Sequence, residues 1–227
     1  MSKTVHPYGF RLGIVRDWKS RWFSGNKFAE LLKADVLIRE YLTKKLRGMY
    51  IEVIEIERTP AIFHIIIKTS RPGLLIGRRG EGTEKIKKMI RDVFKKIGTP
   101  VPRELKLSID EVKNPESRSA IVAQMISESL EKRTPFRRAV KQMLDKVMMN
   151  KCVLGVKVTV SGRLDGSEMG RTETFKKGRV PLQTIRADVD FAREKAFMPY
   201  GQIGIKVWIY RGDIFEDKTQ SKSVSAN

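Results

Sequence analysis

The chain has 227 residues, and its 46 Lys and Arg side chains against 26 Asp and Glu give a net charge of +20 at pH 7. A surplus of this size indicates a polyanionic partner. The 41% of apolar residues can form one or two buried cores, which excludes a disordered basic tail. No apolar run reaches the ~18–20 residues that a membrane span needs, and the first residues lack the apolar core of a secretion signal. We therefore expect a cytoplasmic nucleic-acid-binding protein with no membrane partner.

Cysteine and histidine are too scarce for a disulfide framework or a zinc site. Cys152 is the only cysteine, which excludes an internal disulfide and favours a reducing compartment. Because Cys152 precedes an apolar strand pattern, we expect it to be a buried structural thiol. The two histidines, His6 and His64, lie far apart in the sequence. We expect no metal site and no cofactor.

Residues 1–25 mix aromatic and cationic side chains without a helical or strand period. The segments 8–14 and 18–23 carry most of these side chains. Such an arm can stack on bases or pack against its own domain, and the sequence leaves both readings open.

Residues 26–113 alternate between helical and strand periods. The predicted elements are a helix over 27–47, strands over 51–56 and 62–68, a helical turn over 72–76, a helix over 81–97 and a strand over 105–112. The four residues Gly77-Arg78-Arg79-Gly80 lie between the two later helices. A dinucleotide-binding loop would instead follow a strand. The two glycines permit a tight turn close to a ligand, and two arginines with a helix N-terminus suit a phosphodiester.

Residues 114–215 begin with two helical patterns and continue with strands. Asn114-Pro115 and Thr134-Pro135 are typical helix starts, and alternating apolar residues follow from Leu154, from Ile185 and from Ile203. Two helices followed by half-buried strands predict an α+β domain with the helices on one face of a mostly antiparallel sheet. Residues 216–227 are polar, and we expect a flexible tail there.

Two further groups of cations are candidates for nucleic-acid contact. Arg137, Arg138 and Lys141 share one helical edge without an interleaved acid, and their repulsion costs a few tenths of a kcal/mol per pair, which a phosphate backbone would relieve. The second group lies among glycines in the strand region, where a plain hairpin is an equal alternative. Its members are Arg163, Arg171, Lys176, Lys177 and Arg179.

No pattern in the chain predicts an enzyme. A Walker A sequence is absent. Asp188 and Asp190 are spaced like metal ligands, but on a strand they face the same side as Arg186, so we expect a salt bridge there. We predict no catalytic residues. The alternative function is a free RNA chaperone or regulator of the KH type, a fold whose G-x-x-G loop residues 77–80 resemble.

Motifs along nearly the whole chain resemble one family, the third proteins of the bacterial small ribosomal subunit. The matching motifs include His6-Pro7-x-Gly9-x-Arg11-Leu12-Gly13-Ile14, Trp18-x-Ser20-x-Trp22-Phe23, Arg71-Pro72-Gly73-Leu74-Leu75-Ile76-Gly77-Arg78-Arg79-Gly80, Phe136-Arg137-Arg138-Ala139, Val158-x-Val160-Ser161-Gly162-Arg163-Leu164, Arg171-Thr172-Glu173, Gly178-Arg179-Val180-Pro181-Leu182 and Tyr200-Gly201-x-Ile203-Gly204-x-Lys206-Val207-Trp208-Ile209. The resemblance implies an α+β protein, in which an N-terminal arm (1–25) precedes a type II KH domain of order αββααβ (26–113) and an α+β C-terminal domain (114–215). The family often has lysines where this chain has Arg78 and Arg79, and arginine adds a planar fork to the same charge.

The resemblance also implies a role as a structural constituent of the small ribosomal subunit. Members bind ribosomal RNA in the subunit head, contact head proteins ten and fourteen, and line the messenger RNA entrance together with proteins four and five. By position, Arg137, Arg138 and Lys141 would help to position and unwind messenger RNA, and Gly77 to Gly80 would be the RNA-binding KH loop. The remaining expected ribosomal RNA contacts are Lys3, His6, Arg11, Trp18, Trp22, Arg163, Arg171 and Arg179.

Overall fold

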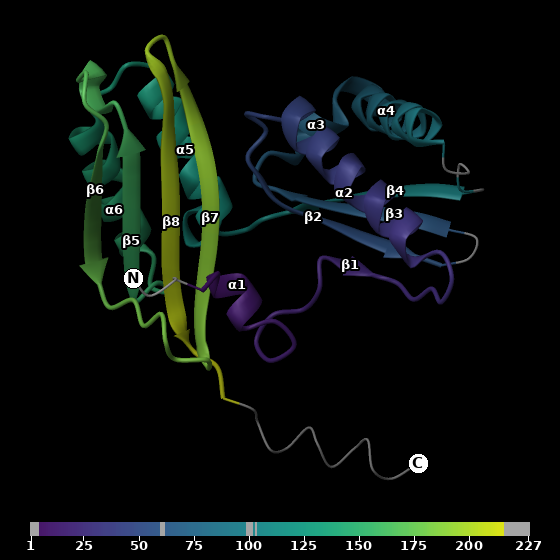
Figure 1. The fold of residues 1–227 in the computed structure, drawn as a ribbon, viewed down its shortest axis with the longest axis horizontal. Helices are drawn as coiled ribbons and strands as arrows, with labels where there is room; N and C mark the ends of the chain where they lie inside the picture. The colour runs from purple at the N-terminus through teal and green to yellow at the C-terminus, as the bar shows by residue number, and fades with distance from the viewer. Residues whose placement is uncertain (1–4, 60–61, 99–101, 103, 216–227) are drawn as a thin grey trace.

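A computed structural model describes residues 5–59, 62–98, 102 and 104–215 (Figure 1). The expected flexible tail (216–227) and the expected RNA contact Lys3 lie outside these residues. Two four-stranded sheets, each with its own helices, stand side by side. Among the described residues, no helix combines the length and apolar character that crossing a bilayer requires.

The first unit has the predicted KH order of elements. Its elements are α2 (Phe28–Lys45), β2 (Ile51–Arg58), β3 (Ile62–Thr69), α3 (Pro72–Ile76), α4 (Glu81–Ile97) and β4 (Glu104–Glu111). Strand β2 pairs antiparallel with β3, and β3 pairs parallel with β4. The apolar faces predicted from the 3.6-residue period are buried, with Ile38, Ile56 and Ile90 fully enclosed between helices and sheet.

The N-terminal arm packs on its own chain and spans both units. Helix α1 (Pro7–Phe10) lies against β7 of the second unit, and β1 (Ser20–Arg21) extends the KH sheet by pairing parallel with β2. The Trp22 Nε1–H donates to Asp35 Oδ2 at 2.7 Å. The sequence left open whether the arm stacks on bases or packs against its own domain, and the structure shows that it packs.

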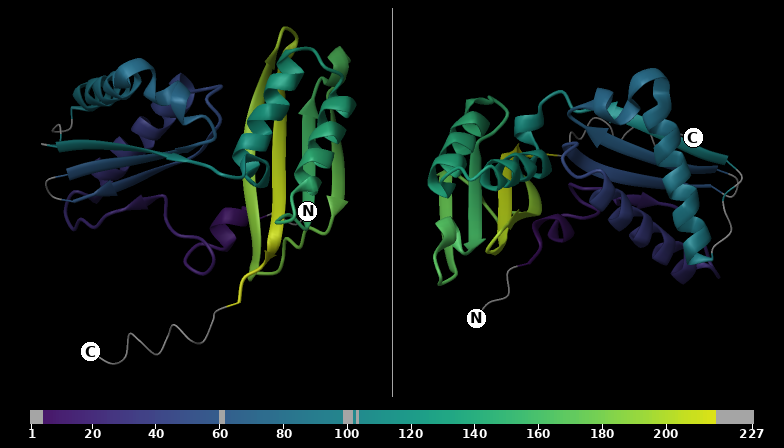
Figure 2. Two further views of the ribbon diagram at one scale, coloured as in Figure 1. Left: turned by 180° about the vertical axis from the view of Figure 1, so that it is seen from behind. Right: turned by 90° about the horizontal axis from the view of Figure 1, so that it is seen from above.

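The second unit is an antiparallel sheet with two helices on one face (Figure 2). Its elements are the 3-10 turn Pro115–Ser117, α5 (Ser119–Glu131), α6 (Phe136–Met149), β5 (Gly155–Gly162), the 3-10 turn Leu164–Gly166, β6 (Arg171–Gly178), β7 (Ala187–Met198) and β8 (Gly201–Asp213). The strand order is β6-β5-β8-β7, and every pair is antiparallel. Inward residues such as Val158, Ile205 and Val207 form the core with α5 and α6.

Three sequence predictions for this unit are wrong at element boundaries. Cys152 is exposed because the chain turns there after α6, with its N–H donating to Asn150 Oδ1. Leu154 and Ile185 are 52% and 44% exposed, and each lies before the first residue of its strand. The period of two therefore applies only from Gly155 and from Ala187.

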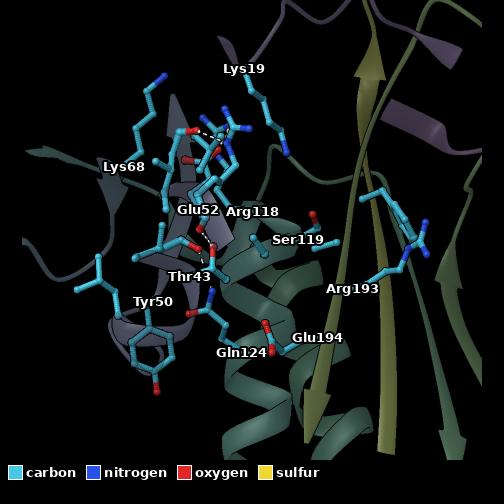
Figure 3. Close-up of a pocket in the computed structure, with 18 of the residues that line it drawn as sticks. Lys19, Thr43, Tyr50, Glu52, Lys68, Arg118, Ser119, Gln124, Arg193 and Glu194 are labelled. Atoms are coloured by element: carbon cyan, nitrogen blue, oxygen red, sulfur yellow. Dashed lines mark hydrogen bonds and ion pairs between the residues drawn. The ribbon is translucent and has the colours of Figure 1, made fainter. Parts of the chain in front are cut away.

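Helix α5 joins the two units. Arg47 Nη2 donates to Glu131 Oε1 at 2.6 Å, and Gln124 Nε2 donates to the Ile51 carbonyl at 2.9 Å. Figure 3 shows Glu52 and Arg118 meeting in the cleft between the units, with 3.0 Å between Oε1 and Nη1. Burial raises the pKa of Glu52. These contacts hold the KH sheet against the second unit.

Candidate nucleic-acid interface

The KH loop is a left-handed turn that projects two arginines. Gly77 has φ 69°, Arg79 φ 54° and Gly80 φ 81°. Glycine adopts this region without strain, which explains the glycines at both ends of the loop. Arg78 and Arg79 are exposed and make no ion pair within the described part of the chain.

A third glycine, Gly82, determines how closely the two helices approach each other. A Cβ at this position would lie 2.1 Å from the Leu75 carbonyl oxygen and 2.8 Å from that of Ile76. Gly82 is not among the residues predicted from the sequence. Its position as the second residue of α4, two residues after Gly80, was the available signal.

The positive charge at the start of α4 comes mainly from Arg78 and Arg79. No side chain caps the first turn, so its N–H groups face the loop. Glu81 and Glu84 lie in that turn, and their negative charges offset the positive potential at the N-terminal end of the helix dipole. Arg78 and Arg79 are therefore the groups of this loop whose chemistry suits an anion, because each guanidinium offers a planar fork of donors.

The second group of cations lies on the exposed edge of α6. Arg137 Nη2 pairs with Glu173 Oε1 of β6 at 3.2 Å, and Arg171 Nε reaches the same oxygen at 3.1 Å. The hydrogen bond from Arg137 holds the pKa of Glu173 below its usual value. Arg138 and Lys141 are exposed and have no ion-pair partner among the residues described. The edge of α6 itself carries no interleaved acid, as predicted, but Glu173 approaches Arg137 from β6, which lies beside α6.

Arg11 is the one predicted RNA contact that the structure contradicts. Its side chain is 0% exposed. Nε donates to the Ala187 carbonyl at 2.7 Å, Nη1 to Pro7 at 3.1 Å, and Nη2 to the carbonyls of Leu182 and Thr184 at 3.0 and 2.9 Å. A guanidinium that is fully enclosed and bonded to backbone carbonyls cannot reach RNA. Arg11 anchors the arm to the second unit.

The other predicted contacts in the arm differ in how accessible they are. Trp18 is 62% exposed, whereas Trp22 is half-buried with its N–H occupied by Asp35. His6 packs edge-on against Phe191 with 4.9 Å between ring centroids. Burial lowers the pKa of His6, and Arg193 adds to the effect, which favours the neutral imidazole.

The predicted arginines of the strand region are exposed but lie at different places. Arg163 Nε donates to the Ser167 carbonyl at 2.9 Å beside Tyr200, and Arg171 lies next to α6. Arg179 follows β6 at its far end. The structure therefore brings Arg171 together with Arg137, and it leaves Arg163 and Arg179 separate.

The Asp188 and Asp190 pair does form salt bridges, but not with Arg186. Asp188 pairs with Arg16 at 2.8 Å and with Arg211 at 2.9 Å, whereas Arg186 pairs with Asp213. A bulge between Ala187 and Val189 breaks the alternation on which the prediction relied. In the described ranges, no three His, Cys, Asp or Glu side chains are grouped as a metal site.

Comparisons with known proteins agree with this architecture. The family described as "Ribosomal protein S3, C-terminal domain" matches residues 126–209, and the KH domain family matches residues 37–117. The chain is 43% identical over 219 residues to small ribosomal subunit protein uS3 of Caldicellulosiruptor saccharolyticus, covering 96% of each protein. It is 42% identical over 230 residues to the same protein of Hydrogenovibrio crunogenus, covering 98% of this chain and 97% of the relative. The chain therefore belongs to the ribosomal protein S3 family, structural and non-enzymatic components of the small ribosomal subunit.

Proposed function

We propose that the chain binds ribosomal RNA in the head of the small subunit and contacts messenger RNA at its entrance, through charge and without bond chemistry. The observation that carries this proposal is the exposure of Arg78 and Arg79 in the KH loop and of Arg138 and Lys141 on the edge of α6, none of which makes an ion pair with a described residue. Cations of this kind bind the phosphates of RNA whatever its base sequence, and they fix the protein's position on the RNA.

The KH loop is the proposed ribosomal RNA contact. Gly77 and Gly80 hold Arg78 and Arg79 outward in a turn that other residues adopt only under strain. Each guanidinium can bind a phosphate through two parallel hydrogen bonds. Exposed His6, Trp18, Arg163, Arg171 and Arg179, together with half-buried Trp22, are proposed as further contacts.

The edge of α6 is the proposed messenger RNA contact. Arg138 and Lys141 are free to hold a single strand, and Arg137 joins them when RNA competes with Glu173. This arrangement stabilises separated strands and performs no work. Unwinding would then be passive in this protein, with the work supplied by movement of the ribosome.

The proposed surroundings are those of a bacterial, cytoplasmic ribosome. Head proteins ten and fourteen are the proposed neighbours, with proteins four and five near the messenger entrance. We also keep the predicted division into an arm (1–25), a KH domain (26–113), a C-terminal domain (114–215) and a tail (216–227) as a proposal.

Sedimentation tests the ribosomal role. Tagged full-length protein from a lysate should migrate with small subunits on a sucrose gradient before and after a high-salt wash. A slow peak bound to mixed RNAs would favour a free KH-type RNA regulator and contradict the proposal.

Translation of structured messages tests the role of α6. Subunits carrying Arg138→Gln and Lys141→Gln should assemble normally but move more slowly through a hairpin-containing message than through an unstructured one. The matched control is Lys33→Gln with Lys45→Gln on α2, which removes two exposed charges elsewhere. If subunits with these substitutions failed to assemble, the edge of α6 would instead be an anchor to ribosomal RNA or protein.

A further inference from the structure

The face of the second sheet opposite α5 and α6 is basic. Val180, Leu182 and His6 pack on its part around Trp208 and Phe191, and the rest, towards β5 and β6, is open. Figure 1 views this face, with both helices behind the strands. Because strand side chains alternate, the register determines which residues point outward. The outer sheet face, as defined here, consists of Lys157, Thr159, Ser161, Thr172, Thr174, Lys176, Phe191, Arg193, Lys195, Gly204, Lys206 and Trp208. This set contains five cations and no acid.

Two pairs of like charges face each other directly across strands. Lys157 of β5 is the register partner of Lys176 of β6, and Lys206 of β8 is the partner of Arg193 of β7. Directly opposed like charges destabilise a sheet. A solvent-facing sheet normally mixes charges of both signs. None of the four side chains makes an ion pair within the described residues, so the fold itself does not relieve the repulsion.

The surface presents hydrogen-bond donors but no stacking platform. Lys157 Nζ lies 5.0 Å from the centroid of the Trp208 ring, and this indole is only 8% exposed. Phe191 is covered by His6 from the arm. Thr159 and Thr174 lie side by side with 3.0 Å between hydroxyl oxygens. Single-stranded RNA is typically bound by stacking on several open aromatic rings. Phe197, two residues beyond Lys195 on β7, is 51% exposed, but the Arg47 guanidinium lies 4.3 Å from its ring centroid.

We propose that the outer sheet face is a separate binding surface for the phosphate backbone of an RNA duplex. Lys157, Lys206, Arg193 and Lys176 would contact phosphates, with the threonine hydroxyls donating between them. Phosphate and hydroxyl contacts of this kind recognise duplex shape without reading sequence. The inference rests on the proposed function in one respect only, that the polyanion is RNA.

Fluorescence anisotropy with the full chain and a labelled RNA duplex of about 16 base pairs, the span of known duplex-binding domains, tests this surface. The test variant is Lys157→Gln with Lys206→Gln. Its charge-preserving partner is Lys157→Arg with Lys206→Arg, and the charge-matched control is Lys33→Gln with Lys45→Gln.

Counterion release sets the size of the expected effect. One phosphate contact contributes about 0.9 to the slope of log K against log salt, or about fivefold in affinity at 0.15 M relative to 1 M salt. The glutamine pair should therefore weaken duplex binding about thirtyfold and lower the slope by about 2, while the arginine pair and the control retain affinity. Equal binding by the glutamine pair and the control would overturn the proposal, as would an equal loss in the arginine pair.

A KH-loop variant separates this inference from the proposed function. If Arg78→Gln with Arg79→Gln weakens RNA binding while the Lys157 and Lys206 pair does not, the sheet proposal fails and the loop proposal stands. If only the sheet pair weakens binding, the sheet proposal is supported and the loop contact is contradicted. Circular dichroism spectra identical to those of the parent protein establish that each variant is folded.

Discussion

Arg11 provides the sharpest test of how the arm is held. Replacing it by Met keeps the length and apolar stem of the side chain but removes every donor. The carbonyls of Pro7 and Ala187 would then lose their partners inside the protein, because the structure buries both of these hydrogen bonds. The acceptors around 181–184 are only partly buried and can recover water.

The two buried hydrogen bonds set the expected magnitude. A hydrogen bond to a charged group contributes about 1.5–3 kcal/mol, so Arg11→Met should lower the free energy of unfolding by about 3–6 kcal/mol. With a urea m-value of about 2 kcal/mol/M, the unfolding midpoint would fall by about 1.5–3 M. A loss of this size is a large fraction of the total stability of a domain.

Urea unfolding of the full chain is the assay, with Arg186→Met as the control. Arg186 forms an exposed pair with Asp213, and such pairs contribute about 1 kcal/mol or less. If Arg11→Met shifted the midpoint no more than Arg186→Met does, the buried anchor would contribute little and the reasoning would be refuted.

Three further predictions concern the KH loop, the edge of α6 and acid stability. Gly82→Ala should lower the free energy of unfolding by about 1–3 kcal/mol or more in a thermal melt, because a Cβ would overlap the α3 backbone. Glu173→Gln should raise affinity for single-stranded RNA in an anisotropy titration, because it releases Arg137. The Arg21 hydrogen bond, aided by His64, holds the pKa of Glu57 below the ordinary value of 4.5 for a glutamate. This contribution to stability is present above pH 4.5 and is lost as the pH falls through the lower folded pKa, so the urea midpoint should decline there.

Each of these predictions has a control or an outcome that would contradict it. Gly73→Ala adds a Cβ in open space on α3 and should leave the melting temperature nearly unchanged. Unchanged RNA affinity in Glu173→Gln would mean that the ion pair does not compete with RNA. Glu57→Gln should show a smaller decline in stability below pH 4.5 than the parent protein, and an identical decline would assign the acid sensitivity to other carboxylates.

Most of the KH domain could be predicted from local patterns. The 3.6-residue period of Ile86, Ile90 and Val93 and the strand runs around Ile54 and Ile65 are properties of neighbouring residues, and the structure buries them as expected. The KH loop could also be predicted from local sequence, because glycine is the residue that adopts positive φ without strain.

Predictions made at the ends of elements were less reliable. A period of two continues through Leu154 in the sequence, although β5 begins only at Gly155. The bulge before Val189 likewise leaves no trace in the pattern of residue types. Hydrogen bonds to other strands decide where a strand begins, and these partners are distant in sequence.

The sequence by itself determined the class of partner, the order of elements and the family of this protein. Net charge, period and motif spacing depend only on residue types and their order. Only the tertiary structure decided what each cation does, because a guanidinium takes its role from whatever lies within about 3 Å of it. It placed Arg11 among backbone carbonyls, Arg137 beside Glu173 and Lys157 opposite Lys176. Those neighbours are brought together by folding from positions far apart in the chain.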